Sequence, residues 1–140
     1  MRKIALFATL AIVLSACGTS PVKLSSATAT PPERVLSHAT PEQGFSPVII
    51  VRDSGFFGSG VYQSIHVDGV LSVKLATGEM AKLYLAPGDH VLGVIPSPNL
   101  FGSHTIYEIG IRIEPNRTHY LRVSIGPEGS SRLAPTAEVQ

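Results

Sequence analysis

The chain has 140 residues, of which 44% are hydrophobic and 15% are charged, and its 11 Lys and Arg nearly balance its 10 Asp and Glu. That length fits one small domain. So balanced a charge argues against a nucleic-acid partner, because binding to phosphates needs clustered Lys and Arg. A single cysteine excludes a disulfide within the chain, so the fold must be stable without one.

Residues 1–16 have the three parts of a secretory signal peptide. Arg2 and Lys3 supply positive charge, residues 4–14 form an apolar run, and the small pair Ser15-Ala16 precedes the expected cleavage site. The run is too short for a membrane span, which takes about 20 apolar residues. Loss of this peptide leaves a mature chain with one more acidic than basic residue.

Cys17 follows the signal peptide directly, and small residues that meet a cysteine at this point resemble the lipobox of bacterial lipoproteins. The resemblance implies that the Cys17 thiol carries a diacylglycerol and that cleavage makes Cys17 the first residue. Two or three acyl chains would then anchor the protein in a membrane almost permanently. The alternative is an ordinary secretory signal with an accidental cysteine. Gly18 stands where Asp often retains lipoproteins at the inner membrane, so we expect the bacterial outer membrane, with the domain facing the periplasm.

The stretch that follows the cysteine is dominated by Ser, Thr, Ala and Pro. Such a composition buries too little apolar surface to offset the entropy of ordering it. We therefore predict a lipidated Cys17 and a disordered tether over residues 17–46, long enough to hold the domain clear of the membrane. Residues 127–140 are similarly poor in bulky apolar side chains and predict a flexible tail.

Residues 47–126 alternate apolar and polar side chains almost throughout, which is typical of half-buried strands. Asp68-Gly69 separates two such runs and suits a tight type I′ turn. Residues 106–114 and 120–125 alternate in the same way and predict a second hairpin. About seven short strands with closely spaced turn signals predict an all-β fold, a small antiparallel β-sandwich.

The order of these strands and turns resembles an uncharacterised family of small bacterial lipoproteins with a domain similar to the PEGA β-sandwich. The resemblance rests on residues 48–52, the glycine loop Gly55-Phe56-Phe57-Gly58-Ser59-Gly60, the run 65–69, and the turn 87–90, with Leu75 and Gly78 between them. It implies a compact all-β domain in the cell envelope and no established activity or catalytic residue. The link at Asp53 departs from the pattern without affecting the expected fold.

The glycine loop does not match a phosphate-binding motif. Val61-Tyr62 stands where a P-loop needs Lys and Ser or Thr, and Gln63 occupies the last glycine position of G-x-G-x-x-G. We expect Phe56 and Phe57 to pack over the core, as aromatic residues usually do. If they are exposed, they form a contact loop for a partner or a lipid.

The five histidines suggest alternative functions, a metal-binding envelope protein or a hydrolytic enzyme, and exposed Tyr and Phe would suit a glycan-binding envelope protein. The candidates are His66, His90, His104 and His119, since His38 falls in the predicted tether. No H-E-x-x-H, paired cysteine or G-x-S-x-G motif supports such chemistry. We therefore expect no metal, no cofactor and no catalytic residue. The leading hypothesis is a non-catalytic interaction domain, anchored by lipid at Cys17, with an unidentified envelope protein as its partner.

Overall fold

Strands dominate the computed structural model, which describes residues 18–56 and 58–137. The predicted signal peptide, Cys17, Phe57 and residues 138–140 lie outside the described residues. Among the described residues, no helix has the length and apolar composition needed to cross a bilayer. The elements are η2 (Leu24–Ser26), β1 (Thr28–Ala29), η3 (Pro32–Arg34), β2 (Ser46–Arg52), β3 (Tyr62–Val67), β4 (Val70–Leu75), β5 (Glu79–Leu85), β6 (Gly88–Ser97), η4 (Leu100–Gly102), β7 (Tyr107–Ile113), β8 (His119–Ile125) and β9 (Ser131–Pro135).

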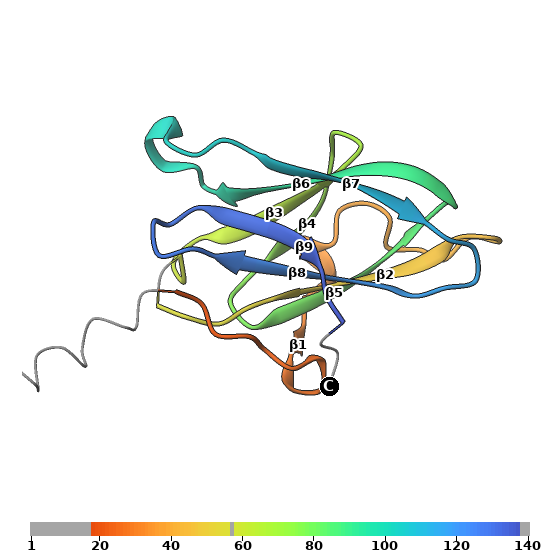
Figure 1. Cartoon of the computed structure of the whole chain (residues 1–140), viewed down its shortest axis with the longest axis horizontal. Coiled ribbons are helices and arrows are strands. Elements are labelled where there is room, and N and C mark those ends of the chain that lie inside the picture. Colours follow the sequence, from red (N-terminus) through yellow and green to blue (C-terminus); the bar gives the residue numbers. More distant parts are fainter. Residues whose placement is uncertain (1–17, 57, 138–140) are drawn as a thin grey trace, which may run out of the picture.

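The strands form two sheets that pack face to face (Figure 1). One sheet has five strands in the order β1-β5-β2-β8-β9, and the other has four in the order β4-β3-β6-β7. The all-β, two-sheet prediction is confirmed, but the prediction of a wholly antiparallel fold is wrong. The β2–β8 and β1–β5 pairs are parallel, so the five-stranded sheet is mixed.

The core lies between the sheets, where the inward residues of each alternating run meet. In β5, for example, Ala81, Leu83 and Leu85 are buried, while Lys82 points to solvent. The other core residues share this inward position and near-complete burial: Val48, Ile50, Ile65, Val67, Val73, Leu75, Leu92, Val94, Ile113, Leu121, Val123 and Leu133.

The turn predicted at Asp68-Gly69 connects β3 to β4 as an antiparallel hairpin. Both residues have positive φ, 50° at Asp68 and 81° at Gly69, as a type I′ turn requires. Val67 pairs with Val70 across the turn, so the hairpin is confirmed.

The second predicted hairpin is wrong, although both of its strands exist. β7 pairs with β6 in the four-stranded sheet, whereas β8 pairs with β2 and β9 in the other sheet. The connection between them therefore crosses from one sheet to the other, and Ser46 Oγ donates a hydrogen bond of 2.8 Å to the Glu114 carbonyl on this connection. Alternation determines which face of a strand is buried, but it does not determine the neighbouring strand.

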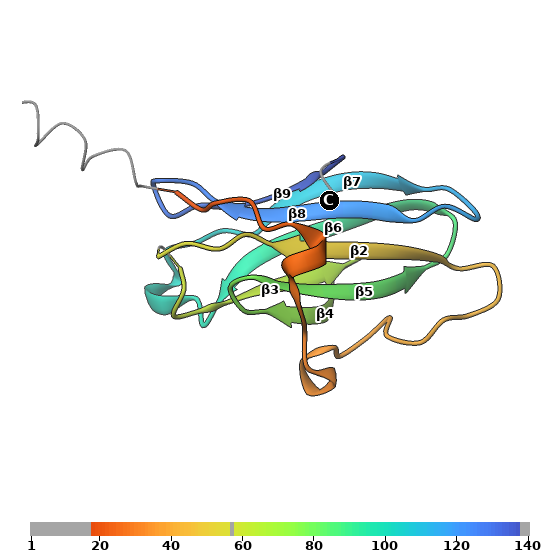
Figure 2. The same ribbon diagram turned by 90° about the horizontal axis from the view of Figure 1, so that it is seen from below.

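The predicted tether is ordered from residue 18 onward and wraps around the sandwich. It crosses the outer face of the five-stranded sheet and passes around the side of the molecule (Figure 2). Thr28–Ala29 adds to β5 as strand β1, and Thr30 N–H donates to the Met80 carbonyl at 2.8 Å. Leu36 N–H then donates to the Ser72 carbonyl of β4 at 2.8 Å. One segment thus covers edges that β5 and β4 would otherwise expose.

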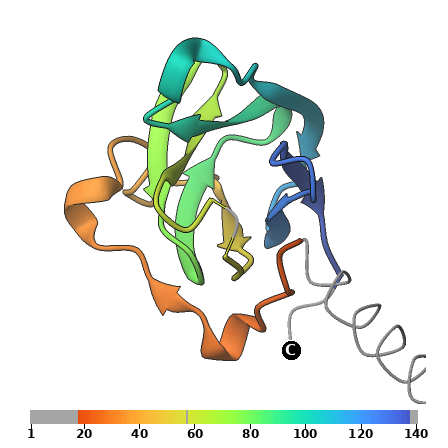
Figure 3. The same ribbon diagram turned by 90° about the vertical axis from the view of Figure 1, so that its left-hand side faces the viewer.

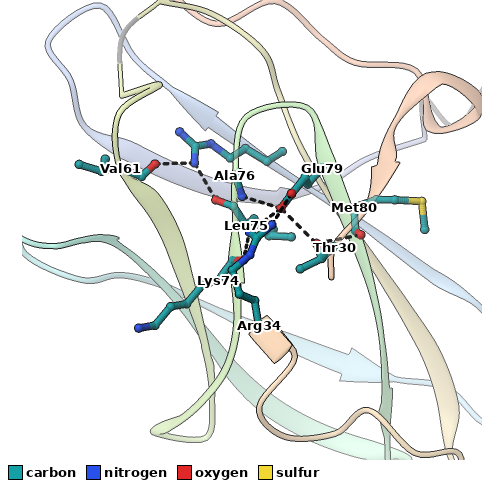
Figure 4. A network of polar contacts seen from close by, with 9 residues as sticks. Thr30, Arg34, Val61, Lys74, Leu75, Ala76, Glu79 and Met80 are labelled. Atoms are coloured by element: carbon teal, nitrogen blue, oxygen red, sulfur yellow. Dashed lines mark hydrogen bonds and ion pairs between the residues drawn. The ribbon is translucent and has the colours of Figure 1, made fainter. Parts of the chain in front are cut away.

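An ion pair fixes this segment between the two edges. Arg34 binds both carboxylate oxygens of Glu79 on β5, one of them at 2.7 Å, and donates to the Lys74 carbonyl of β4 at 2.9 Å (Figure 4). Glu79 also accepts from Ala76 N–H and from the Thr30 hydroxyl. The composition argument failed here because the segment is held by backbone and charged hydrogen bonds rather than by apolar burial.

A second ion pair holds the start of the N-terminal segment, just before η2. Asp53 and Arg122, with side chains only 4% and 12% exposed, pair on the outer face of the five-stranded sheet. Val22 N–H donates to the Asp53 carboxylate, and Arg122 donates to the Val22 carbonyl. Together the two pairs make residues 18–36 part of the domain.

The predicted flexible tail is also ordered in part. Ser131–Pro135 forms β9, antiparallel to β8, and Leu133 is buried against the core. Ser131 Oγ donates a buried hydrogen bond of 2.6 Å to Gln63 of β3, which joins the two sheets. The tail prediction failed because one inward leucine and a strand ladder suffice to hold this short segment.

Candidate functional site

Several connections gather at one end of the sandwich, which we call the loop end. Figure 3 looks onto it. It comprises the loops that follow β2, β6 and β8, at residues 53–61, 98–106 and 126–130, and the short β4–β5 connection 76–78. The other end, which we call the turn end, carries the shorter connections 68–69 and 86–87 and the crossover 114–118.

The described chain begins at the loop end. Ser20 and Ser54 form two backbone hydrogen bonds of 2.6 and 3.1 Å, and the Thr19 hydroxyl accepts one from Ile125 N–H at 3.1 Å. A Cβ atom placed on Gly55 would lie 3.1 Å from the Gly18 carbonyl oxygen. The glycine loop therefore touches the residue that directly follows Cys17 in the sequence.

The predicted contact-loop residue Phe56 lies on this loop, and its side chain is 89% exposed. The expectation that it packs over the core is therefore wrong, and the alternative of an exposed aromatic residue holds for Phe56. Phe57 lies outside the described residues. Leu100, on the neighbouring loop, is 56% exposed. Phe56 and Leu100 thus present large apolar side chains to solvent at the loop end.

Arg52 holds the glycine loop in place from the core side of β2. It stands at the end of β2, is 1% exposed, and faces the core like Val48 and Ile50. Its guanidinium donates to the carbonyls of Gly58 at 2.6 Å, Val61 at 2.8 Å and Leu75 at 2.7 Å. Burial lowers the pKa of Arg52 to about 10.

The neighbouring loop is closed by its own hydrogen bonds. Asn99 Nδ2 donates to the His104 carbonyl at 2.8 Å, and His104 N–H donates to Asn99 Oδ1 at 3.2 Å. Between this loop and the glycine loop lies a small cavity of about 170 Å³, lined in part by Gly58, Leu100 and Ile125. It is too small for most ligands, which occupy pockets of about 300 to 1,000 Å³.

The two ends of the sandwich differ in charge. Residues 54–61 and 98–106 contain no Asp, Glu, Lys or Arg. The exposed carboxylate in the third loop, Glu128, is bound by the Ser130 hydroxyl and by Arg132. The turn end carries two exposed ion pairs in its connections and the adjoining strands, Arg112 with Asp89 and Arg117 with Glu114.

The histidines are not assembled into a metal site. Among residues 18–56 and 58–137, no group of three or more His, Cys, Asp or Glu side chains could hold a metal ion. His119 Nε2 accepts from Glu114 N–H at 3.0 Å, and His38 Nδ1 lies 3.1 Å from Ser72 Oγ. His66 lies on β3, and His104 lies in the loop after β6.

His90 has the most developed surroundings of these histidines. Its Nδ1 lies 2.7 Å from the Asp68 carboxylate, and its Nε2 lies 2.8 Å from the Ala86 carbonyl. Burial alone would lower the pKa of His90, but these two partners outweigh burial and raise it. The Asp68 carboxylate accepts hydrogen bonds from Val91 N–H and from His90. Both lower the pKa of Asp68, and the bond from Val91 has the larger effect. The cluster links the β3–β4 turn to β6, so it stabilises the fold.

Arg52 is the residue of this end that sequence reasoning missed. Alternation from Val48 through Ile50 already places Arg52 on the buried face of its strand. Comparison of the sequence with protein-family models and with curated proteins finds no match.

Proposed function

We propose that the chain is a lipid-anchored protein of the bacterial cell envelope whose β-sandwich acts by contact rather than by catalysis. The observation that carries this proposal is the cysteine at position 17, which follows a charged start, an apolar run and two small residues. The proposed anchor is a diacylglycerol thioether on Cys17, and the proposed location is the outer membrane, facing the periplasm.

The structure supports the proposal through the position of Gly18. This residue is already in contact with the glycine loop, so the domain starts where the signal peptide is expected to end. Because Cys17 directly precedes Gly18, lipid could be attached to Cys17 while the whole domain stays folded. The described polar clusters support a non-catalytic role, since Arg34, Glu79, Asp53 and Arg122 bind the chain's own backbone.

The order of the turn motifs supports a further proposal, that the chain belongs to the small lipoprotein family with PEGA-like domains. Its partner would be a protein of the same envelope. Crosslinking in cells, followed by mass spectrometry of the captured complex, identifies such a partner.

Replacement of the cysteine tests the proposal directly. We expect Cys17→Ser to abolish incorporation of a labelled fatty acid and to move the protein from the membrane to the soluble fraction. Ser15→Ala is the matched control, because it keeps a small residue before the cleavage site and leaves the cysteine intact. Equal membrane attachment and labelling of the wild type and Cys17→Ser would reject the proposal.

A further inference from the structure

We infer that the loop end of the sandwich lies directly on the lipid surface, with Phe56 and Leu100 inserted among the lipids. This inference rests on the proposed anchor at Cys17 and adds how the domain is oriented and which side chains touch the membrane. It replaces the earlier expectation of a domain held away from the bilayer by a long tether.

The first argument is the length of chain between the anchor and the domain. Consecutive Cα atoms are about 3.8 Å apart, so an acylated residue 17 lies within one such step of Gly18. Gly18 contacts Gly55, and the next residues are bonded to Ser54 and Ile125. No slack remains for the loop end to move far from a membrane that holds residue 17.

The second argument is the chemistry of the surface that this geometry turns toward the lipid. Phe56 is 89% exposed and Leu100 is 56% exposed, and both stand in stretches without a charged residue, 54–61 and 98–106. Ile106, the last residue of the loop after β6, and Tyr107, the first residue of β7, are also partly exposed, at 39% and 43%. Aromatic and apolar side chains favour the boundary between headgroups and acyl chains.

The third argument is that the loop is held in its exposed position. Arg52 binds the carbonyls of Gly58 and Val61, which follow Phe56 in the loop. Gly58 has a φ of 71°, and an added Cβ would lie 2.4 Å from Ile125 Cδ1, so the chain is packed tightly here. Ser54, before Phe56, is bonded to Ser20, and Gly58, after it, is bonded to Arg52, so anchored residues on both sides limit the conformational freedom that Phe56 loses on contact with lipid.

The absence of tryptophan from the sequence makes the orientation measurable. Single Phe56→Trp and Leu100→Trp variants of the full chain are produced in bacteria and reconstituted in vesicles of phosphatidylethanolamine and phosphatidylglycerol with bromine-labelled phosphatidylcholine. Val70→Trp is the matched control, because Val70 is 52% exposed but stands at the turn end.

We expect brominated lipid to quench fluorescence at positions 56 and 100 at least about twofold, with emission shifted to shorter wavelength, and to leave position 70 unquenched. Because residues 54–61 and 98–106 contain no Asp, Glu, Lys or Arg, 0.5 M salt should leave the quenching unchanged. Intact mass measured on the same samples separates the two proposals. If Cys17 is acylated but positions 56 and 100 are quenched no more than position 70, the orientation is wrong and the anchor stands. If Cys17 is not acylated, both fail.

Discussion

Arg34→Met tests whether the wrapped N-terminal segment is part of the folded domain. Methionine keeps most of the apolar length of the side chain but removes the bonds to Glu79 and to the Lys74 carbonyl. It also removes the guanidinium that lies 4.8 Å from the ring centre of Tyr62. The segment should then lose the ion pair that joins it to the β4 and β5 edges but keep its backbone hydrogen bonds to both strands.

The size of the stability loss expected for Arg34→Met follows from the surroundings of Glu79. Its side chain is 11% exposed and that of Arg34 is 17% exposed, so the pair is largely buried. Removing one partner of a buried pair costs about 3 to 5 kcal/mol. Glu79 keeps hydrogen bonds from Ala76 and Thr30 and some contact with water, which favours the low end, about 3 kcal/mol.

Thermal unfolding followed by circular dichroism measures this loss on the full chain, extracted in detergent. About 3 kcal/mol corresponds to a midpoint lower by roughly 10 to 15 °C for a domain of this size. Arg112→Met is the matched control, because its pair with Asp89 is 73% and 76% exposed, and we expect a change of less than about 2 °C. Equal midpoints for the two variants would refute the reasoning that the segment is energetically part of the sandwich.

Three further predictions concern the two ends of the sandwich. His90 has a raised pKa, so its bond to Asp68 stabilises the fold fully below about pH 6.5 and is lost as pH rises through the folded pKa. The midpoint difference between the wild type and His90→Gln should thus be larger at pH 5.5 than at pH 8.5, and a constant difference would contradict this. Arg52→Met leaves three carbonyls without their donor, and we expect about 1 to 3 kcal/mol lower stability in urea unfolding, with faster proteolysis of the glycine loop; unchanged proteolysis would show that Arg52 does not hold the loop. Gly58→Ala meets Ile125 and a positive φ, so we expect about 1 to 3 kcal/mol lower stability, whereas an equally stable variant would mean that the loop rearranges freely.

Alternation in the sequence was sufficient to predict the fold class and most of the strands. It placed Ala81, Leu83 and Leu85 on the buried face of β5, and turn chemistry placed the hairpin at Asp68-Gly69. It could not predict that β7 and β8 lie in different sheets, because a strand with one buried face is compatible with either partner.

The N-terminal segment shows where composition fails. A Ser-, Thr- and Pro-rich stretch buries little apolar surface, yet Thr28–Ala29 pairs with β5, and Arg34 bonds to both sheets. These bonds depend on the positions of open strand edges, which exist only after the sheets have formed. The exposure of Phe56 was equally beyond prediction, since a pair of aromatic residues in a loop is compatible with either a buried or an exposed position.

The most direct test of the central proposal is the intact mass of the wild-type protein extracted from bacterial membranes. The account predicts a chain that begins at Cys17 and carries the added mass of a diacylglycerol, with or without a third acyl chain. A membrane-extracted chain that begins elsewhere, or that carries Cys17 without acyl groups, would contradict it.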